Sequence, residues 1–242
     1  MKRLLTYLTA LLCLSIFFYS CEPENDNGDN GDNTEDPNGK PDDQSDDKEP
    51  IKVHGCPDGN HPHAMDLGLP SGTKWACCNV GASSPEDYGG YYAWGEVEEK
   101  DDYDTDNYFY YNTDTEEYVN LGSDSVKISY DVAHVLMGGS WQMPSNAQID
   151  ELVSCCTHTW TQKNGVNGIL VTGPNGGQVF FPAAGYRWSD EFDDAGTYGC
   201  YWSGSLIPGY NSNAYAFYFA SDDWSRVSVI RYPGRSVRAV CP

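Results

Sequence analysis

The amino-acid sequence predicts an α+β domain, built from two short helices and short antiparallel strands and preceded by a disordered tether. Residues 22–50 are almost entirely acidic, amide, glycine or proline residues, which cannot bury enough apolar surface to fold. A capped segment with helical spacing follows Pro144. After it, short apolar segments alternate with Gly and Pro turns, and this order favours an α+β fold over a parallel sheet.

Residues 1–20 combine a charged start with a short apolar core. Lys2 and Arg3 precede the apolar run 4–18, which is shorter than the ~20 residues that cross a bilayer comfortably. This composition is typical of a secretory signal peptide. The sequence FYSC at 18–21 resembles a bacterial lipobox, which implies that Cys21 is acylated and becomes the new N-terminus. An uncleaved helical anchor or an ordinary signal peptide is the alternative.

Residues 21–52 form the predicted acidic tether. Twelve acidic residues in 22–50 stand against Lys40 and Lys48, and mutual repulsion keeps such a segment extended. An acidic segment directly after the lipidated cysteine also resembles the surface-export signal of Bacteroidetes lipoproteins, with a plain spacer as the alternative. We therefore expect a lipoprotein of the outer membrane that faces the cell surface.

Residues 53–242 are long enough for one domain with its own core. Residues 51–242 hold 24 acidic and 10 basic residues, a net charge of −14, without a basic cluster. Such a domain repels nucleic acid. Of nine cysteines, Cys13 lies in the signal peptide and Cys21 is the lipidation site. The odd remainder leaves at least one thiol unpaired within the chain, and the sequence does not reveal the pairing.

The first predicted strand covers residues 73–80, and two helices follow it. The first helix covers 131–137, with Gly138 and Gly139 ending it. The second begins after Pro144, where Ser145 and Gln148 can form a capping box. Apolar residues recur at helical spacing and predict core-facing stripes. These residues are Val132, Val135 and Leu136 in the first helix, and Ile149, Leu152, Val153 and Cys156 in the second.

The remaining predicted elements are strands. Segments 169–172 and 178–181 flank a Pro-Asn-Gly-Gly turn and predict a hairpin. In 214–219, Tyr215, Phe217 and Phe219 share one face, with the smaller Ala214 and Ala216 opposite, so the aromatic face is expected to be buried. Segments 226–231 and 236–240 complete the meander.

Several segments resemble a known family when they are taken in order. They are DLGLPSGTKWA (66–76), CNVGA (78–82), PEDYG (85–89), YYAWGE (91–96), GGSWQMP (138–144), FPAAGYR (181–187), YWSGS (201–205) and GRSVR (234–238). Over about residues 63–242 the chain resembles the Fibrobacter succinogenes major paralogous domain of Bacteroidetes lipoproteins. That family is related to the C-type-lectin-like fold and, more distantly, to formylglycine-generating enzymes. The resemblance implies a C-type-lectin-like domain with adjacent ends and a long irregular region, and no specific activity.

Residues 86–124 carry the candidate ligand-binding groups. This segment holds thirteen acidic residues with Lys100 as its only base, interleaved with aromatic rings. Tyr and Trp rings can stack on a sugar while carboxylates accept its hydroxyl hydrogens. We expect Tyr91, Tyr92 and Trp94 to be core anchors. The aromatic residues expected to be exposed are Tyr103 and the run 108–111, and the predicted ligand-binding residues are Tyr103, Tyr108, Tyr110 and Tyr111.

No metal site is predicted. Asp102, Asp104 and Asp106 alternate as in a calcium loop, but glycine and glutamate are missing at the required later positions. Four residues near the start of the domain have side chains that can ligate zinc. They are His54, Cys56, His61 and His63. Their spacing matches no established zinc site, and an irregular segment is the preferred interpretation.

No catalytic residue and no cofactor are predicted. Cys200 and Cys241 lack the sequence surroundings of the cysteine pair in formylglycine-generating enzymes, and His134 and His158 lie in no nucleophile motif. The arginines of the resembling segments are expected to form structural ion pairs with buried carboxylates. These are Arg187, Arg235 and Arg238.

The sequence therefore favours a membrane-anchored, surface-exposed lipoprotein whose domain binds an extracellular ligand, with glycan as the first candidate. A structural or protein-interaction module in cell-envelope assembly or adhesion is the alternative. An enzyme related to formylglycine formation is a distant third.

Overall fold

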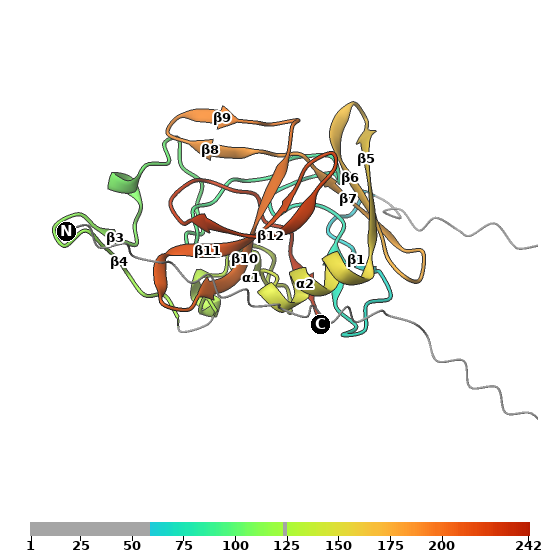
Figure 1. Ribbon diagram of the computed structural model, residues 1–242, viewed down its shortest axis with the longest axis horizontal. Helices are drawn as coiled ribbons and strands as arrows, with labels where there is room; N and C mark the ends of the chain where they lie inside the picture. Colours follow the sequence, from blue (N-terminus) through green and yellow to red (C-terminus); the bar gives the residue numbers. More distant parts are fainter. Residues whose placement is uncertain (1–58, 123–124) are drawn as a thin grey trace, which may run out of the picture. The chain divides into compact units, whose positions relative to one another are not determined.

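The computed structural model of the protein describes residues 59–122 and 125–242. The predicted signal peptide, the tether, Cys21, His54 and Cys56 lie outside these residues. In the described part of the chain, no helix has both the length and the apolar character that crossing a bilayer requires. The described residues form antiparallel sheets and two α-helices (Figure 1), so the predicted α+β class is confirmed.

Both predicted helices are present. Helix α1 is Val132–Met137 and helix α2 is Asn146–Cys155. The predicted capping box begins α2, since the Ser145 side chain accepts from the Gln148 backbone N–H and the Gln148 side chain accepts from the Ser145 N–H. Ile149 and Leu152 are fully buried, as their spacing predicts.

The predicted core stripe of α1 is wrong for two residues. Val132 is buried, but Val135 and Leu136 are 45% and 52% exposed. The helix has only six residues and buries the side that carries Val132 and Ala133. The Asp131 carboxylate fixes this orientation, because it accepts from the backbone N–H of His134 at 3.1 Å and of Met143 at 2.9 Å.

The largest buried sheet has the order β10–β11–β12. Its strands are β10 (Gly199–Ile207), β11 (Tyr210–Phe219) and β12 (Trp224–Ile230). Helix α2 packs against all three (Figure 1). Phe217 and Phe219 are buried as predicted, but Ala214 and Ala216 on the opposite face are also fully buried. This sheet is therefore covered on both faces.

A second three-stranded sheet has the order β5–β6–β7. Its strands are β5 (Thr157–Lys163), β6 (Val166–Thr172) and β7 (Gln178–Pro182). The hairpin predicted around residues 173–177 is confirmed as β6–β7. A small hairpin follows, built from β8 (Tyr186–Trp188) and β9 (Glu191–Asp193).

The two ends of the described domain meet in a sheet of the order β1–β2–β13. Its strands are β1 (Ala64–Asp66), β2 (Lys74–Ala76) and β13 (Val240–Cys241). The predicted strand 73–80 is shorter than expected, and Cys77 and Cys78 lie in a bend in which both are buried. The predicted strand 236–240 is regular only at its end, where β13 begins at Val240.

The segment between β2 and α1 is largely irregular. Its described residues form two 3-10 turns, Thr105–Asn107 and Ile128–Tyr130, and the two-residue strands β3 (Tyr111–Asn112) and β4 (Glu117–Tyr118). Adjacent ends and a long irregular region are the coarse features that the family resemblance implies.

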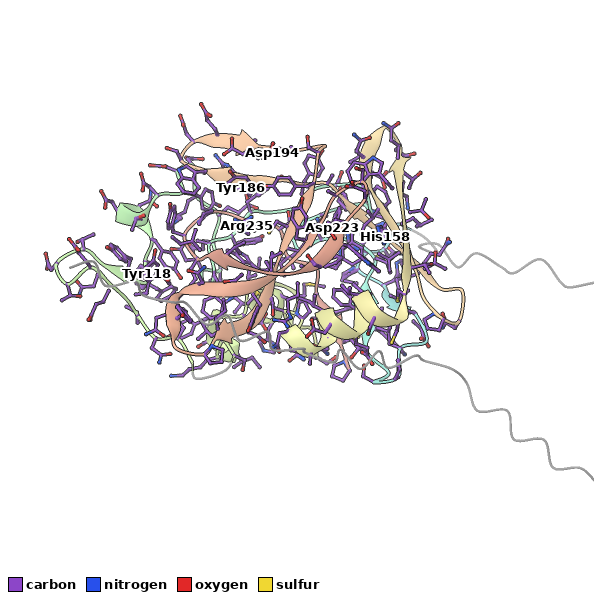
Figure 2. The ribbon with its side chains drawn as sticks, viewed as in Figure 1. Tyr118, His158, Tyr186, Asp194, Asp223 and Arg235 are labelled. Carbon is purple, nitrogen blue, oxygen red and sulfur yellow. The ribbon has the colours of Figure 1, made fainter. Side chains whose placement is uncertain are left out.

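The buried arginines of the core contact backbone carbonyls, an amide oxygen and aromatic rings rather than carboxylates. Arg238 is fully buried and donates to Asn79 Oδ1, Ala76 O and Phe180 O at 2.8–3.0 Å. The Arg235 guanidinium lies 5.0 Å from the ring centroid of Tyr186, with which it is labelled in Figure 2, and 5.3 Å from that of Trp202. The prediction of carboxylate partners for Arg187, Arg235 and Arg238 is wrong for the described residues. Carbonyls and aromatic faces stabilise a guanidinium without the desolvation of a second charge.

Candidate functional site

Two of the four predicted ligand-binding tyrosines belong to the core. Tyr103 and Tyr108 are 0% and 2% exposed, so the expectation of exposure is wrong for both. The Tyr103 hydroxyl donates to Tyr91 O, and the Tyr108 hydroxyl donates to Trp94 O. A buried phenol is stable when its hydroxyl has such a partner. These rings therefore support the segment 91–94 from within, and Tyr91, Tyr92 and Trp94 are core residues as predicted.

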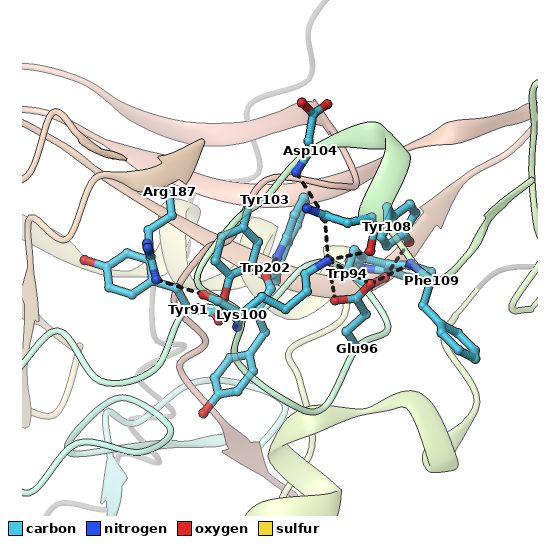
Figure 3. A network of polar contacts seen from close by, with 12 residues as sticks. Tyr91, Trp94, Glu96, Lys100, Tyr103, Asp104, Tyr108, Phe109, Arg187 and Trp202 are labelled. Carbon is cyan, nitrogen blue, oxygen red and sulfur yellow. Dashed lines mark hydrogen bonds and ion pairs between the residues drawn. The ribbon is translucent and has the colours of Figure 1, made fainter. Parts of the chain in front are cut away.

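Lys100 organises the loops above these rings (Figure 3). Its Nζ lies 2.9 Å from Glu96 Oε2 and donates to Asn107 O and Oδ1 at 3.1 and 3.2 Å. The same ammonium lies over the rings of Tyr103 and Tyr108 at 5.3 and 5.9 Å. The only base of the predicted acidic segment is thus used internally, to join residues 96–100 to residues 103–109.

Glu96 places an aromatic ring at the surface. Its Oε1 accepts from the backbone N–H of Phe109 at 2.8 Å, and the Phe109 side chain is 79% exposed. The Tyr110 ring supports the Phe109 ring in an edge-to-face contact, with the two ring centroids 5.1 Å apart. Tyr110 and Tyr111 are both half-buried, which leaves part of each ring accessible.

The acids 102, 104 and 106 serve local structure in part. The Asp104 carboxylate and the Asn107 side chain form a capping box around the 3-10 turn Thr105–Asn107. An oxygen that caps this turn is occupied by a backbone N–H.

An open hollow of about 380 Å³ lies beside Phe109. Its lining includes Glu96, Glu98, Glu99, Lys100, Asn107 and Tyr110. The carboxylates of Glu98 and Glu99 are exposed. The hollow therefore combines apolar ring faces with carboxylate acceptors, and its one cation is already paired with Glu96.

A second hollow of about 470 Å³ shares Glu99 with the first. Phe192 of β9 lines it and is 60% exposed, with the Arg187 guanidinium 4.6 Å from its ring centroid. Arg187 is fixed in turn by donating to Lys100 O and Asp101 O at 2.9 and 2.8 Å. Five residues that line these two hollows are called the Glu99 strip. They are Phe109, Tyr110, Glu98, Glu99 and Phe192.

Sequence reasoning found the region of this strip but not all of its residues. Phe109 lies in the predicted run 108–111, whereas Phe192 was not predicted. Phe192 is surrounded by acidic residues in the short hairpin β8–β9. An aromatic residue in so polar a hairpin has no core to enter, and this signal favours an exposed ring.

Two of the residues considered for catalysis, Cys200 and His158, pack against other parts of the domain. Cys200 lies in the core strand β10, where burial raises the pKa of its thiol. His158, labelled in Figure 2, lies with its ring centroid 4.3 Å from that of Trp224, and burial lowers the pKa of its imidazole.

Comparison of the chain with protein-family models, curated proteins and solved structures gave no match.

Proposed function

We propose that this chain is an outer-membrane lipoprotein, anchored through acylated Cys21, whose C-type-lectin-like domain binds an extracellular glycan along the Glu99 strip. The observation that carries the proposal is a pair of exposed rings, Phe109 and Phe192, which line two hollows that share the exposed Glu99. Their supports, the Glu96–Lys100 pair and Arg187, fix these groups before a ligand arrives.

The chemistry of the strip suits a sugar. The apolar C–H face of a pyranose ring stacks on an aromatic ring, and its hydroxyls donate to carboxylates at the ring edge. Two hollows in succession offer space for more than one sugar unit. An anionic ligand fits poorly, because the exposed groups of the strip that carry charge are acidic.

Phe109→Ala is expected to weaken glycan binding about tenfold. The variant removes one stacking contact, and ~1.4 kcal/mol corresponds to a factor of ten in affinity. Binding is measured on a glycan array and then by calorimetry with the strongest ligand. Tyr210→Ala is the matched control, because Tyr210 is also an aromatic residue with high exposure, 67%, but lies outside the strip. Equal binding by both variants contradicts the proposed site.

A second candidate function is protein interaction in cell-envelope assembly or adhesion. Ile128, Val135 and Leu136 are 64%, 45% and 52% exposed, and the turn and helix that carry them are in contact. Clustered exposed apolar side chains are typical of protein interfaces. Two results together establish this second function instead. The wild type binds no glycan on the array, and it captures an envelope protein that Leu136→Asp does not capture.

The proposed anchor has its own test. Cells that express the wild-type chain are expected to incorporate labelled palmitate into the protein, and the Cys21→Ala variant is expected to incorporate none. Each buried methylene of an acyl chain contributes about 0.8 kcal/mol of membrane binding, so the variant is also expected to leave the membrane fraction. Label that persists in Cys21→Ala refutes the anchor.

A further inference from the structure

Three side chains that can ligate a metal ion meet beside the hairpin of β1 and β2. They are His61, His63 and Cys77, and their ligand atoms all lie within 4.8 Å of one another. The Cys77 Sγ lies 3.2 Å from His61 Nδ1 and 3.6 Å from His63 Nδ1. Both histidines are partly exposed, whereas Cys77 is buried.

Strand pairing brings this cluster together. In the ladder of β1 and β2, Ala64 faces Ala76, and one step further His63 faces Cys77, whose N–H donates to His63 O at 3.0 Å. The His63 N–H donates in turn to the Cys77 Sγ at 3.0 Å. The backbone itself therefore holds the sulfur against the histidine that precedes β1.

We propose that His61, His63 and Cys77 bind a Zn²⁺ ion. In a tetrahedral site with Zn–S of ~2.3 Å and Zn–N of ~2.0–2.1 Å, sulfur and nitrogen ligands lie about 3.5 Å apart. The two observed Sγ–Nδ1 distances, 3.2 and 3.6 Å, lie on either side of this value. Both sulfur–nitrogen pairs thus have the separation of tetrahedral ligands, and the nitrogens of His61 and His63 lie within 4.8 Å of each other.

The surroundings of the sulfur also fit a metal-bound thiolate. An N–H donor to the sulfur stabilises its negative charge, as hydrogen bonds around the first ligands do at metal centres. The rings of His61 and His63 stand at 85° to each other with centroids 5.5 Å apart, so they do not block each other by stacking.

A cavity beside Cys77 can hold a further ligand. Cys77 lines this cavity of about 260 Å³ together with Met65, Thr161, Gln162 and Gln178. The three ligands from the described residues leave one position of a tetrahedral zinc ion to a further donor. The cavity supplies room for that donor beside Cys77.

The spacing of the histidines alone does not reveal this site. Within the cluster at the start of the domain, His61 and His63 match no zinc motif, and Cys77 is 14 residues beyond His63. Only the antiparallel pairing of β1 with β2 makes Cys77 a neighbour.

Cobalt titration tests the proposal on the full-length chain, solubilised in detergent, reduced and freed of metal. One equivalent of Co²⁺ is expected to produce thiolate-to-cobalt charge-transfer absorption and the intense visible bands of four-coordinate cobalt, both removed by Zn²⁺. His61→Gln, His63→Gln and Cys77→Ser are each expected to weaken Co²⁺ binding at least tenfold. His158→Gln, a partly exposed histidine elsewhere, is expected to bind as the wild type does.

Circular dichroism of each variant separates loss of a ligand from loss of the fold. Cys77 is 3% exposed, and its replacement can disturb packing, whereas the partly exposed His61 is replaced without opening the core. A wild type that shows no charge-transfer absorption overturns the proposal, as does unchanged cobalt binding in both histidine variants. Either result leaves the glycan test with Phe109→Ala unaffected.

Discussion

Arg238→Ala is expected to leave the domain largely unfolded at room temperature. Arg238 is fully buried, and its guanidinium donates to three acceptors on two segments, Asn79 Oδ1 and Ala76 O on one and Phe180 O on the other. It also lies 4.6 Å from the Phe181 ring centroid. Each buried acceptor left without a donor costs about 1–3 kcal/mol. Together these losses approach the ~5–15 kcal/mol that stabilise a typical domain.

Arg226→Ala provides the matched control. Arg226 pairs with Asp150 at 2.7 Å, but this Asp150 side chain is 52% exposed. Solvent screens such a pair, and its loss is expected to change the free energy of unfolding by at most about 1 kcal/mol. Urea denaturation followed by circular dichroism compares the two variants. If Arg238→Ala and Arg226→Ala unfold at the same urea concentration, the bonds of Arg238 do not stabilise the fold.

Arg238→Met separates hydrogen bonding from packing. Methionine fills much of the arginine volume and removes a desolvated charge, which by itself is favourable. The three acceptors remain without donors, however. The variant is therefore expected to be more stable than Arg238→Ala and less stable than the wild type, in the same urea experiment.

Elements with local signals are the ones that the sequence predicts well. The capping box of Ser145 and Gln148 lies within four residues, and it marks the start of α2 correctly. The hairpin β6–β7 is likewise marked by its turn. Both signals are visible because all the interacting residues are neighbours in the chain.

Strand β10 is not predicted from the sequence, because the residues that bury it are distant from it in the chain. Eight of its nine residues are buried, so it has no alternation of apolar and polar residues. Gly199 also resembles a loop residue in the sequence. In the structure a Cβ at this position would lie 2.1 Å from the Phe219 ring, so glycine permits close contact with β11.

The candidate site shows the same limit. The neighbouring residues Tyr108 and Phe109 are 2% and 79% exposed, respectively. The difference arises from Trp94 O, which accepts from the Tyr108 hydroxyl across 14 positions of sequence. A run of aromatic residues locates a functional region, but distant backbone partners decide which rings reach solvent.

Alkaline pH is expected to unfold the domain in one cooperative step between about pH 10 and pH 12. Six of the described tyrosines are buried and have phenol pKa values above the usual ~10, chiefly because burial disfavours the phenolate. The shift is large in five of them, which are Tyr91, Tyr92, Tyr103, Tyr108 and Tyr201. For Tyr92 and Tyr103 burial raises the pKa to about 12.

The sign of the effect follows from proton binding. A tyrosine with a raised pKa in the folded state keeps its proton there after the unfolded chain has lost it. Its stabilising contribution is full below about pH 10 and is lost as the pH rises toward its folded pKa. Each such tyrosine removes about 1.4 kcal/mol per pH unit from the free energy of unfolding, and five remove about 7 kcal/mol. One pH unit thus removes about as much as the whole stability of a typical domain.

Tyrosinate absorbance and far-ultraviolet circular dichroism, recorded on the same samples, measure this transition. The two signals are expected to change together, because the buried rings ionise only as the fold opens. Tyr103→Phe keeps the ring but removes one ionising group, so its unfolding should depend less steeply on pH. The same variant is expected to lose about 1 kcal/mol at neutral pH, since Tyr91 O loses its donor. A domain that retains its circular dichroism at pH 12 while these tyrosines ionise would show that their burial does not control the stability of the fold.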